Sequence, residues 1–219
     1  MQSKMISDDS QPMPTWRLAN LLIFLGFSAL ALFIGLSGVN QPLFLYINHQ
    51  HGMLPDRVWE GLNLIAYSRF FILPSTLLLL TITLRRQYIF NVILLIAAYY
   101  ILFTLLKHVF AVPRPYMVLQ AGSFYWLNLF ENSVKGAYQS FPSGHCANMA
   151  IFAFALNFMF FAQNKFLQFL MLLLVILCGL ARICTGWHWP LDVICSGLLG
   201  YLLVKLCFIL RQPSYCGTK

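Results

Sequence analysis

The sequence predicts an all-α, polytopic membrane protein with six transmembrane helices in a bundle and both chain ends in the cytoplasm. Composition supports this fold class, because 60% of the 219 residues are hydrophobic, 9% are charged, and the mean hydropathy is +0.74. A soluble domain carries about 25% charged residues. Several apolar runs reach about 18 residues with almost no charge, which is typical of membrane helices.

Six apolar runs follow one another along the chain, and each is expected to form one span. Their approximate bounds, in order, are 19–37, 70–84, 88–106, 142–162, 166–183 and 190–210. Polar connections separate them, including a loop at about 38–68 and a long loop at about 107–141. A single membrane domain, 19–211, is therefore expected, with polar tails at 1–18 and 212–219.

Basic side chains indicate how the spans are oriented. With six spans, eight Lys and Arg residues lie on the side of the termini and six lie opposite, namely Arg57, Arg69, Lys107, Arg114, Lys135 and Arg182. If Lys107, Arg114 and Arg182 serve chemistry, eight stand against three, and the positive-inside rule places both ends in the cytoplasm. The first run, preceded by Lys4 and Arg17, also fits a signal peptide, but this topology favours a retained span.

Other classes of protein fit the composition less well. The net charge is +8, but the basic residues are scattered between apolar runs, so we expect anionic lipid or bound phosphate as their partner and no nucleic acid. The six Cys form no CxxC pair, which argues against a disulfide framework or a zinc site. His49 and His51 have no evident third ligand, so no metal and no cofactor are expected.

Three polar clusters fall on the same outer face under this topology. They are KHVFAVPRP at 107–115, PSGH at 142–145 and RICTGWHWPLD at 182–192. Lys107, Arg114 and Arg182 supply three cations with no acids nearby in sequence. Such a group needs an anion, and phosphate suits it because Arg presents a planar fork to its oxygens. Charges at this depth are costly and usually functional.

The PSGH cluster predicts a phosphate-binding helix start. Pro142 suits the first position of a helix, where its missing N–H would be unpaired anyway. The N–H groups of Ser143, Gly144 and His145 would then face an anion, and Gly144 allows close approach. His145 lies in the same turn and can give a proton to a leaving oxygen.

His188 and Asp192 complete the constellation. Asp192 falls in the first turn expected after Pro190, where the helix dipole favours an acid. It can accept a hydrogen bond from one ring nitrogen of His188, which leaves the other nitrogen to attack phosphorus. Taken singly, each of these residues fits a structural role, but their joint spacing favours catalysis.

Together these motifs resemble the integral-membrane type 2 phosphatidic acid phosphatases, which share a catalytic core with bacterial acid phosphatases and vanadium haloperoxidases. The family pattern is Lys, six residues, Arg-Pro; then Pro-Ser-Gly-His; then Ser-Arg, five residues, His, three residues, Asp. This sequence matches the pattern in order, with Lys107, Arg114-Pro115, residues 142–145, and then Arg182, His188 and Asp192. The resemblance covers roughly residues 60–210. Ala181 departs from the usual Ser, which removes a possible hydroxyl contact.

The resemblance implies a metal-independent, two-step phosphoryl transfer. His188 would attack phosphorus, His145 would protonate the leaving oxygen, and water would release phosphate from the phosphohistidine. Phosphate would be bound by Lys107, Arg114, Ser143, Gly144 and Arg182. The site is expected to face the periplasm or outer side of a bacterial inner membrane.

Several substrates and two other functions remain open. Undecaprenyl diphosphate is the first candidate, because small bacterial members of the family commonly act on it; phosphatidylglycerophosphate, phosphatidate and lipid A phosphates follow. The same residues would serve a lipid-to-lipid phosphotransferase. A non-catalytic phospholipid-binding or carrier protein would not need both His residues and Asp192. Vanadate-dependent halide oxidation is disfavoured, since those relatives are soluble.

Three further features have a structural interpretation. His108 follows Lys107 and is expected to point away from the site. Glu131 and Lys135 have helical spacing and suggest an exposed ion pair. The aromatic stretch 124–126 suits an interfacial belt, or less readily a grip on a lipid tail.

Overall fold

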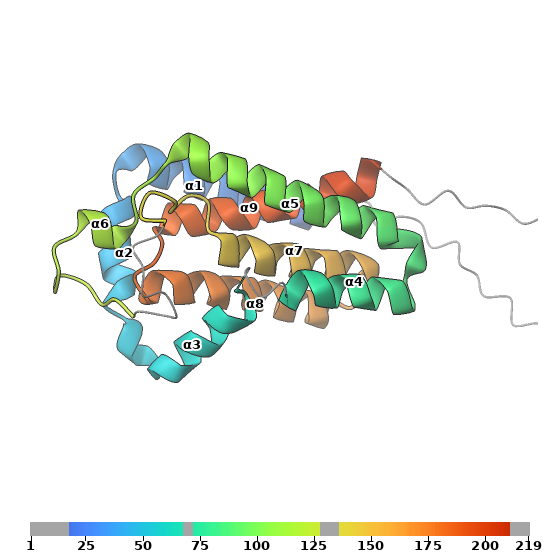
Figure 1. The fold of residues 1–219 in the computed structure, drawn as a ribbon, viewed down its shortest axis with the longest axis horizontal. Coiled ribbons are helices and arrows are strands. Elements are labelled where there is room, and N and C mark those ends of the chain that lie inside the picture. Colours follow the sequence, from blue (N-terminus) through green and yellow to red (C-terminus); the bar gives the residue numbers. More distant parts are fainter. Residues whose placement is uncertain (1–17, 68–71, 128–135, 211–219) are drawn as a thin grey trace, which may run out of the picture.

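The computed structural model describes residues 18–67, 72–127 and 136–210, and within these ranges it is all-helical (Figure 1). Six apolar helices run along the long axis of the molecule. They are α1 (Leu18–Ser37), α4 (Ile72–Leu84), α5 (Ile89–Phe110), α7 (Gly144–Met159), α8 (Lys165–Cys184) and α9 (Pro190–Leu210). Short helices connect them: α2 (Asn40–Asn48), η1 (His51–Met53), α3 (Asp56–Ile65), η3 (Arg86–Tyr88) and α6 (Pro115–Val118).

The six apolar helices coincide with the six predicted runs, but they differ in length. Three stretches within the described ranges are long and apolar enough to cross a membrane by themselves: 86–118, 165–184 and 190–209. A fourth is possible if α1 and the helical segment after it, which bend by 108°, count as one span. Helix α7 has 16 residues, or about 24 Å, and α4 has 13, both shorter than an apolar layer of about 30 Å. The membrane class is confirmed, while six complete spans remain a prediction.

The segment 38–68 was expected to be a loop, and this expectation is wrong. It contains α2, η1 and α3, which lie at one end of the bundle (Figure 1). In α3, Trp59 and Asn63 are four residues apart and share a buried face, whereas Asp56 and Arg57 are exposed. A one-sided pattern of this kind forms a short helix lying on other helices.

Helix α7 lies at the centre of the bundle and packs mainly on α8 and α9. Close approach depends on small residues, as is common between membrane helices. A Cβ atom on Gly200 would come within 3.0 Å of the Ala150 Cβ, and one on Gly179 would come within 2.5 Å of the Val193 Cγ1. The Gly200 contact brings α9, which carries Asp192, close to α7, and the Gly179 contact brings α8, which carries Arg182, close to α9.

The two ends of the bundle differ in character. Helices α2, α3 and α6 lie at one end, and the turn between α4 and α5, with Arg85 and Arg86, lies at the other (Figure 1). The polar tails predicted at 1–18 and 212–219 fall almost wholly outside the described residues. The domain bounds and the cytoplasmic placement of the termini therefore stay predictions.

Candidate active site

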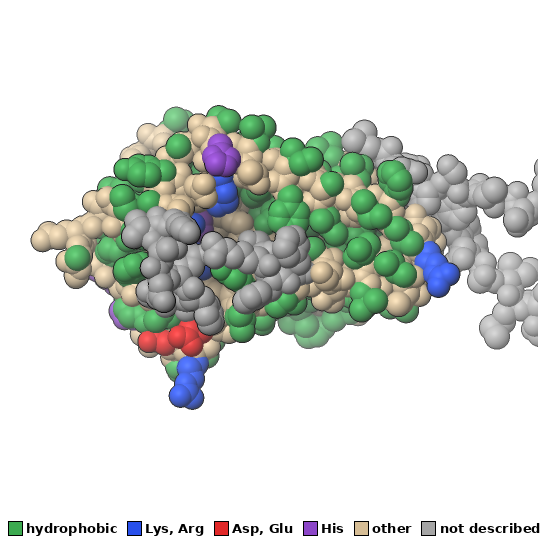
Figure 2. Space-filling model, in the orientation of Figure 1, with side chains coloured by type: hydrophobic (Ala, Val, Ile, Leu, Met, Phe, Trp, Pro, Cys, Tyr) green, Lys and Arg blue, Asp and Glu red, His purple; other side chains and the backbone are tan. Residues whose placement is uncertain are grey.

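The three polar clusters come together at the end of the bundle that carries α2, α3 and α6. Figure 2 shows Lys, Arg and His side chains gathered toward this end, whereas the flank of the bundle is mostly hydrophobic. Each cluster occupies the end or beginning of a long helix: the end of α5, the start of α7, and the α8–α9 connection. The convergence predicted from the alternating topology is thus present.

The first cluster is shaped by the end of α5. Ala111 adopts a left-handed conformation (φ 42°), and its N–H bonds to the carbonyl of Lys107 at 3.2 Å, which ends the helix. Pro113 and Pro115 follow, so the chain turns out of the helix and then begins α6 at Pro115. Arg114 therefore lies in the connection between α5 and α6, while Lys107 lies in the last turn of α5.

A returning segment, residues 136–140, holds both cations of this cluster. The backbone N–H of Arg114 donates to the carbonyl of Ala137 at 2.9 Å, and its Nε donates to the carbonyl of Gly136 at 3.0 Å. The Lys107 Nζ donates to the carbonyl of Gln139 at 3.0 Å. These acceptors are neutral, so these bonds position the two side chains without themselves offsetting their charge.

The start of α7 differs from the prediction in one respect. Pro142 is not the first helical residue: the Phe141–Pro142 bond is cis, Ser143 is the N-cap, and Gly144 begins the helix. The Ser143 hydroxyl caps the Cys146 N–H at 3.5 Å, and the Ser143 N–H donates to the Ser196 Oγ at 2.7 Å. The Ser143 N–H is thus engaged within the protein, and among the described residues only the N–H groups of Gly144 and His145 remain for an anion.

Asp192 is the centre of a small buried network in the first turn of α9. Its Oδ2 accepts from the Ser140 hydroxyl at 2.5 Å and from the Trp189 N–H at 3.0 Å. The Nδ1 of His188 lies 3.5 Å from the same oxygen, longer than a good hydrogen bond. Catalytic hydrogen bonds are often this long before substrate binds. The orienting role predicted for Asp192 has the required placement.

His188 is almost completely buried, with 1% of its surface exposed, in the connection between α8 and α9. Burial, followed by the positive charges of Arg114, Arg182 and Lys107, holds the pKa of His188 well below its usual value. The three predicted cations therefore all act on this one imidazole. A neutral ring with Nδ1 toward Asp192 leaves Nε2 available as a nucleophile.

Arg182 and Arg114 share one aromatic surface. Their guanidinium carbons lie 5.4 Å and 5.2 Å from the centre of the Trp187 ring, within the range of cation–π contact. Arg182 is 4% exposed, and its Nη1 donates to the Oδ1 of Asn63 at 2.5 Å. Ala181, where the family has Ser, is fully buried beside Trp59 and Cys184.

Four residues of this site were missed by sequence reasoning: Asn63, Ser140, Trp187 and Ser196. Ser196 has a local signal, because it follows Asp192 by one helical turn and its hydroxyl donates to the Asp192 carbonyl. Trp187 precedes the predicted nucleophile. Asn63 lies 119 residues from its partner, so no local pattern in the sequence could have found it.

The structure also places the other features noted in the sequence. His108 is exposed, as expected. His51 stacks on Tyr125 at 3.8 Å, and within the described ranges no three His, Cys, Asp or Glu side chains could hold a metal. Trp126 packs on Tyr116 and Trp187 and is 44% exposed, which suits either role considered for the aromatic stretch. Glu131 and Lys135 lie outside the described residues.

Two curated proteins are similar in sequence. The bacitracin transport permease protein BcrC of Bacillus licheniformis is 39% identical over 69 residues, a match that covers 32% of each chain. The undecaprenyl-diphosphatase of Sulfolobus acidocaldarius is 29% identical over 184 residues, covering 82% of this chain and 84% of the relative. The chain thus matches only about a third of the first relative and most of the second.

Two solved structures share the fold. LpxE of Aquifex aeolicus has a TM-score of 0.62 at 24% identity, covering 78% of this chain and 95% of that one. A PAP2-type phosphatidylglycerolphosphate phosphatase of Bacillus subtilis has a TM-score of 0.60 at 22% identity, covering 91% and 96%. The PAP2 superfamily model matches residues 88–216, more than half of the sequence. The chain belongs to the PAP2 superfamily of membrane lipid phosphatases.

Proposed function

We propose that this protein is a metal-independent lipid phosphatase that works through a phosphohistidine on His188. One observation carries the proposal: a buried imidazole with Asp192 behind its Nδ1 and three cations acting on it. An anion bound against this imidazole would interact favourably with all three positive side chains. A phosphate group supplies that charge together with the electrophilic phosphorus.

In the first step, the Nε2 of His188 attacks phosphorus and the bond to the leaving oxygen breaks. Asp192 stabilises the positive charge that develops on the ring. His145, in the first turn of α7, gives its proton to the leaving oxygen. Lys107, Arg114 and Arg182, with the N–H groups at Gly144 and His145, stabilise the charge growing on the phosphoryl oxygens.

In the second step, water attacks the phosphohistidine. His145, now neutral, takes a proton from that water, the P–N bond breaks, and inorganic phosphate leaves. His188 returns to its neutral form and His145 to its protonated form, so the cycle closes without a cofactor. The same residues would serve phosphotransfer if a lipid hydroxyl or phosphate replaced the water.

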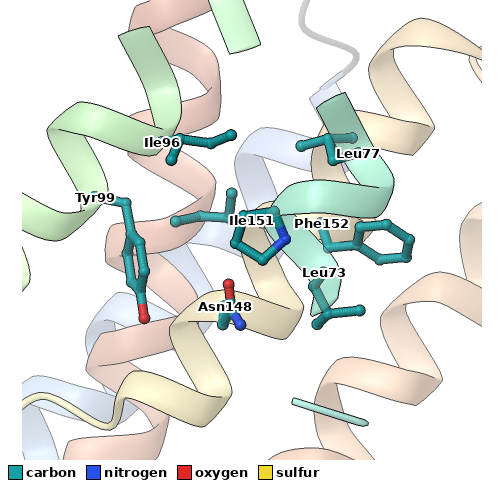
Figure 3. Close-up of a pocket in the computed structure, with 8 residues that line it drawn as sticks. Leu73, Leu77, Ile96, Tyr99, Asn148, Ile151 and Phe152 are labelled. Carbon is teal, nitrogen blue, oxygen red and sulfur yellow. The ribbon is translucent and has the colours of Figure 1, made fainter. Parts of the chain in front are cut away.

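An apolar crevice between α4, α5 and α7 supports a lipid substrate. It is a partly open groove, and it is lined by Leu73, Pro74, Leu77, Ile96, Tyr99, Asn148, Ile151 and Phe152 (Figure 3). Figure 3 shows the Tyr99 hydroxyl and the Asn148 amide at the same end of the crevice. The Tyr99 hydroxyl donates to the carbonyl of Gly144 at 3.1 Å, so this end adjoins the proposed phosphate site. A tail in the crevice would place a head group at the start of α7.

Undecaprenyl diphosphate is the substrate we favour, because the relative matched over most of the chain is an undecaprenyl-diphosphatase. Phosphatidylglycerophosphate, phosphatidate and lipid A phosphates are the alternatives. The proposed location is the inner membrane of a bacterium, with the site at the periplasmic or outer side. The Arg85–Arg86 pair at the opposite end of the bundle supports this orientation.

Phosphate release from the four lipids, measured side by side with purified protein in detergent and excess chelator, tests the proposal. His188→Ala is the control. We expect release that survives chelation and falls by at least about 1,000-fold in the variant, as for loss of a covalent nucleophile. Full turnover by His188→Ala would rule out the mechanism. Label from a ³²P-lipid that appears on a second lipid would indicate phosphotransfer.

A further inference from the structure

Arg182 lies between two groups that come from different parts of the chain. One guanidinium nitrogen, Nη1, donates to the Asn63 Oδ1 at 2.5 Å, and the guanidinium carbon lies 5.4 Å from the centre of the Trp187 ring. Arg182 and Asn63 are 4% and 3% exposed. Asn63 belongs to α3, which precedes the region matched by the family model. A residue outside that region therefore touches the proposed phosphate-binding site.

The carboxamide of Asn63 is itself held in one orientation. Its Nδ2 donates to the carbonyl of Trp59, one turn earlier in α3, at 2.7 Å. This bond fixes the amide nitrogen and turns the oxygen toward Arg182. Trp59 is anchored in turn, because its Nε1 donates to the carbonyl of His51 at 2.8 Å and its ring packs with Ala181 and Cys184 of α8. Asn63 thus presents a preset acceptor, which limits the rotamers open to Arg182.

The neutral charge of Asn63 matters as much as its geometry. A carboxylate at this position would also accept from Arg182, but it would neutralise the guanidinium and compete with a phosphate group. An amide oxygen positions the side chain without itself adding a negative charge beside the ligand. Lys107 and Arg114 also donate to neutral acceptors, the backbone carbonyls of Gln139 and Gly136.

We infer that Asn63 is a positioning residue that holds Arg182 in the geometry required to bind the phosphoryl group; this inference rests on the proposed phosphatase function. Asn63→Ala should lower kcat/KM and weaken inhibition by orthovanadate, a phosphate analogue, by roughly 10-fold or more, as for loss of a hydrogen bond to a charged group. Asn63→Asp keeps an acceptor but adds a negative charge, so it should weaken vanadate inhibition further than Asn63→Ala.

Asn91 offers a matched control. It is another buried asparagine in a helix and is 2% exposed. Its Nδ2 donates to the carbonyl of Cys207 at 2.8 Å, and both residues lie at the ends of α5 and α9 that are remote in sequence from the site residues. Asn91→Ala should lower the melting temperature in detergent but leave the vanadate inhibition constant within about twofold of wild type, because it removes no contact to a phosphate ligand. If Asn63 had a purely structural role, Asn63→Ala would give the same result as Asn91→Ala: a lower melting temperature and an unchanged vanadate inhibition constant.

A double-mutant cycle shows whether Asn63 acts through Arg182. With Arg182→Lys as background, Asn63→Ala should change kcat/KM by less than about twofold, because the partner it positions is gone. Additive losses in the double variant, or wild-type vanadate inhibition in both Asn63 variants, would overturn the inference. No phosphate release by wild-type protein from any lipid, with vanadate binding intact and reduced by Asn63→Ala, would instead reject hydrolysis and keep the positioning role.

Discussion

His188 is placed among positive charges and away from water, so the stability of the folded protein should depend on pH. Because burial and Arg114, Arg182 and Lys107 lower its pKa, the folded state resists protonation of the ring while the unfolded state does not. As pH falls below about 6.5, the usual pKa of His, the unfolded state binds the extra proton and the folded state loses stability.

The sign of this effect yields the first prediction. The melting temperature in detergent should fall more steeply for wild type than for His188→Gln when pH is lowered from 7.5 to 5.5. Glutamine keeps a polar side chain but cannot titrate, so the difference between the two slopes reports His188 together with the groups coupled to it. Parallel slopes for the two proteins would mean that His188 titrates normally in the folded state.

Ser140 carries a second prediction at the residue scale. Its hydroxyl donates to the Asp192 Oδ2 at 2.5 Å, and the same oxygen faces His188. Ser140→Ala should lower kcat by about 10-fold with little change in KM, because Asp192 is held less firmly while the cations that bind phosphate are untouched. Steady-state kinetics on the best lipid substrate measures both constants.

Ser37→Ala is a suitable control, because the Ser37 hydroxyl bonds to the Phe33 carbonyl in an exposed part of α1. It should leave both constants at wild-type values. If Ser140→Ala raised KM and left kcat unchanged, Ser140 would serve substrate binding and not the orientation of Asp192.

At the scale of helices, the contact between α8 and α9 sets the distance between Arg182 and the His188–Asp192 pair. Gly179 lies one turn before Arg182 and faces Val193, which follows Asp192. Gly179→Ala would place a Cβ 2.5 Å from the Val193 Cγ1, so the helices must separate or the valine must shift. We expect kcat/KM to fall by about 10-fold, as small displacements of positioned groups are costly.

The compensating change is Val193→Ala, which removes the clashing methyl group. The double variant Gly179→Ala/Val193→Ala should recover most of the lost kcat/KM. Gly197→Ala in α9 provides a control, because a Cβ there meets no atom within 4 Å. Failure of the second substitution to restore activity would mean that Gly179 matters for another reason, such as backbone flexibility.

The short helices show where sequence reasoning failed at this scale. Apolar runs of 20 residues were visible without a structure. In contrast, α2 is short and contains a proline and polar residues, and α3 contains charged residues, so both resemble a loop. Asn48 illustrates the reason: its amide bonds to the carbonyls of Tyr125, Ile183 and Cys184. Such helices are stabilised by tertiary contacts more than by their own propensity.

For the molecule as a whole, the orientation in the membrane is the main prediction. A green fluorescent protein fused after Lys219 should fluoresce in bacterial cells, because it folds in the cytoplasm, where the positive-inside rule places the chain end. Alkaline phosphatase inserted at Gly122 should be active, because it requires the periplasm. Gly122 lies in a turn with φ +86° and open space around it, so an insertion there is tolerated.

Both reporters are needed, because each serves as the control for the other. Fluorescence together with phosphatase activity would place Gly122 and the C-terminus on opposite sides of the membrane. An odd number of spans would then separate them. If both reporters indicated the same side, an even number of the helices α7, α8 and α9 would cross the membrane, and the six-span topology would be wrong.

By itself, the sequence determined the membrane class, the approximate bounds of the apolar helices and the eight residues proposed for chemistry. Those features are local: a run of apolar side chains, a proline before a helix, or a fixed spacing of His and Asp is visible in neighbouring residues. The tertiary structure alone decided that Ser143 uses its N–H internally, that Ser140 bonds to Asp192, and that Asn63 holds Arg182 across 119 residues. Such contacts depend on how helices pack, and packing joins residues whose separation along the chain carries no periodic signal.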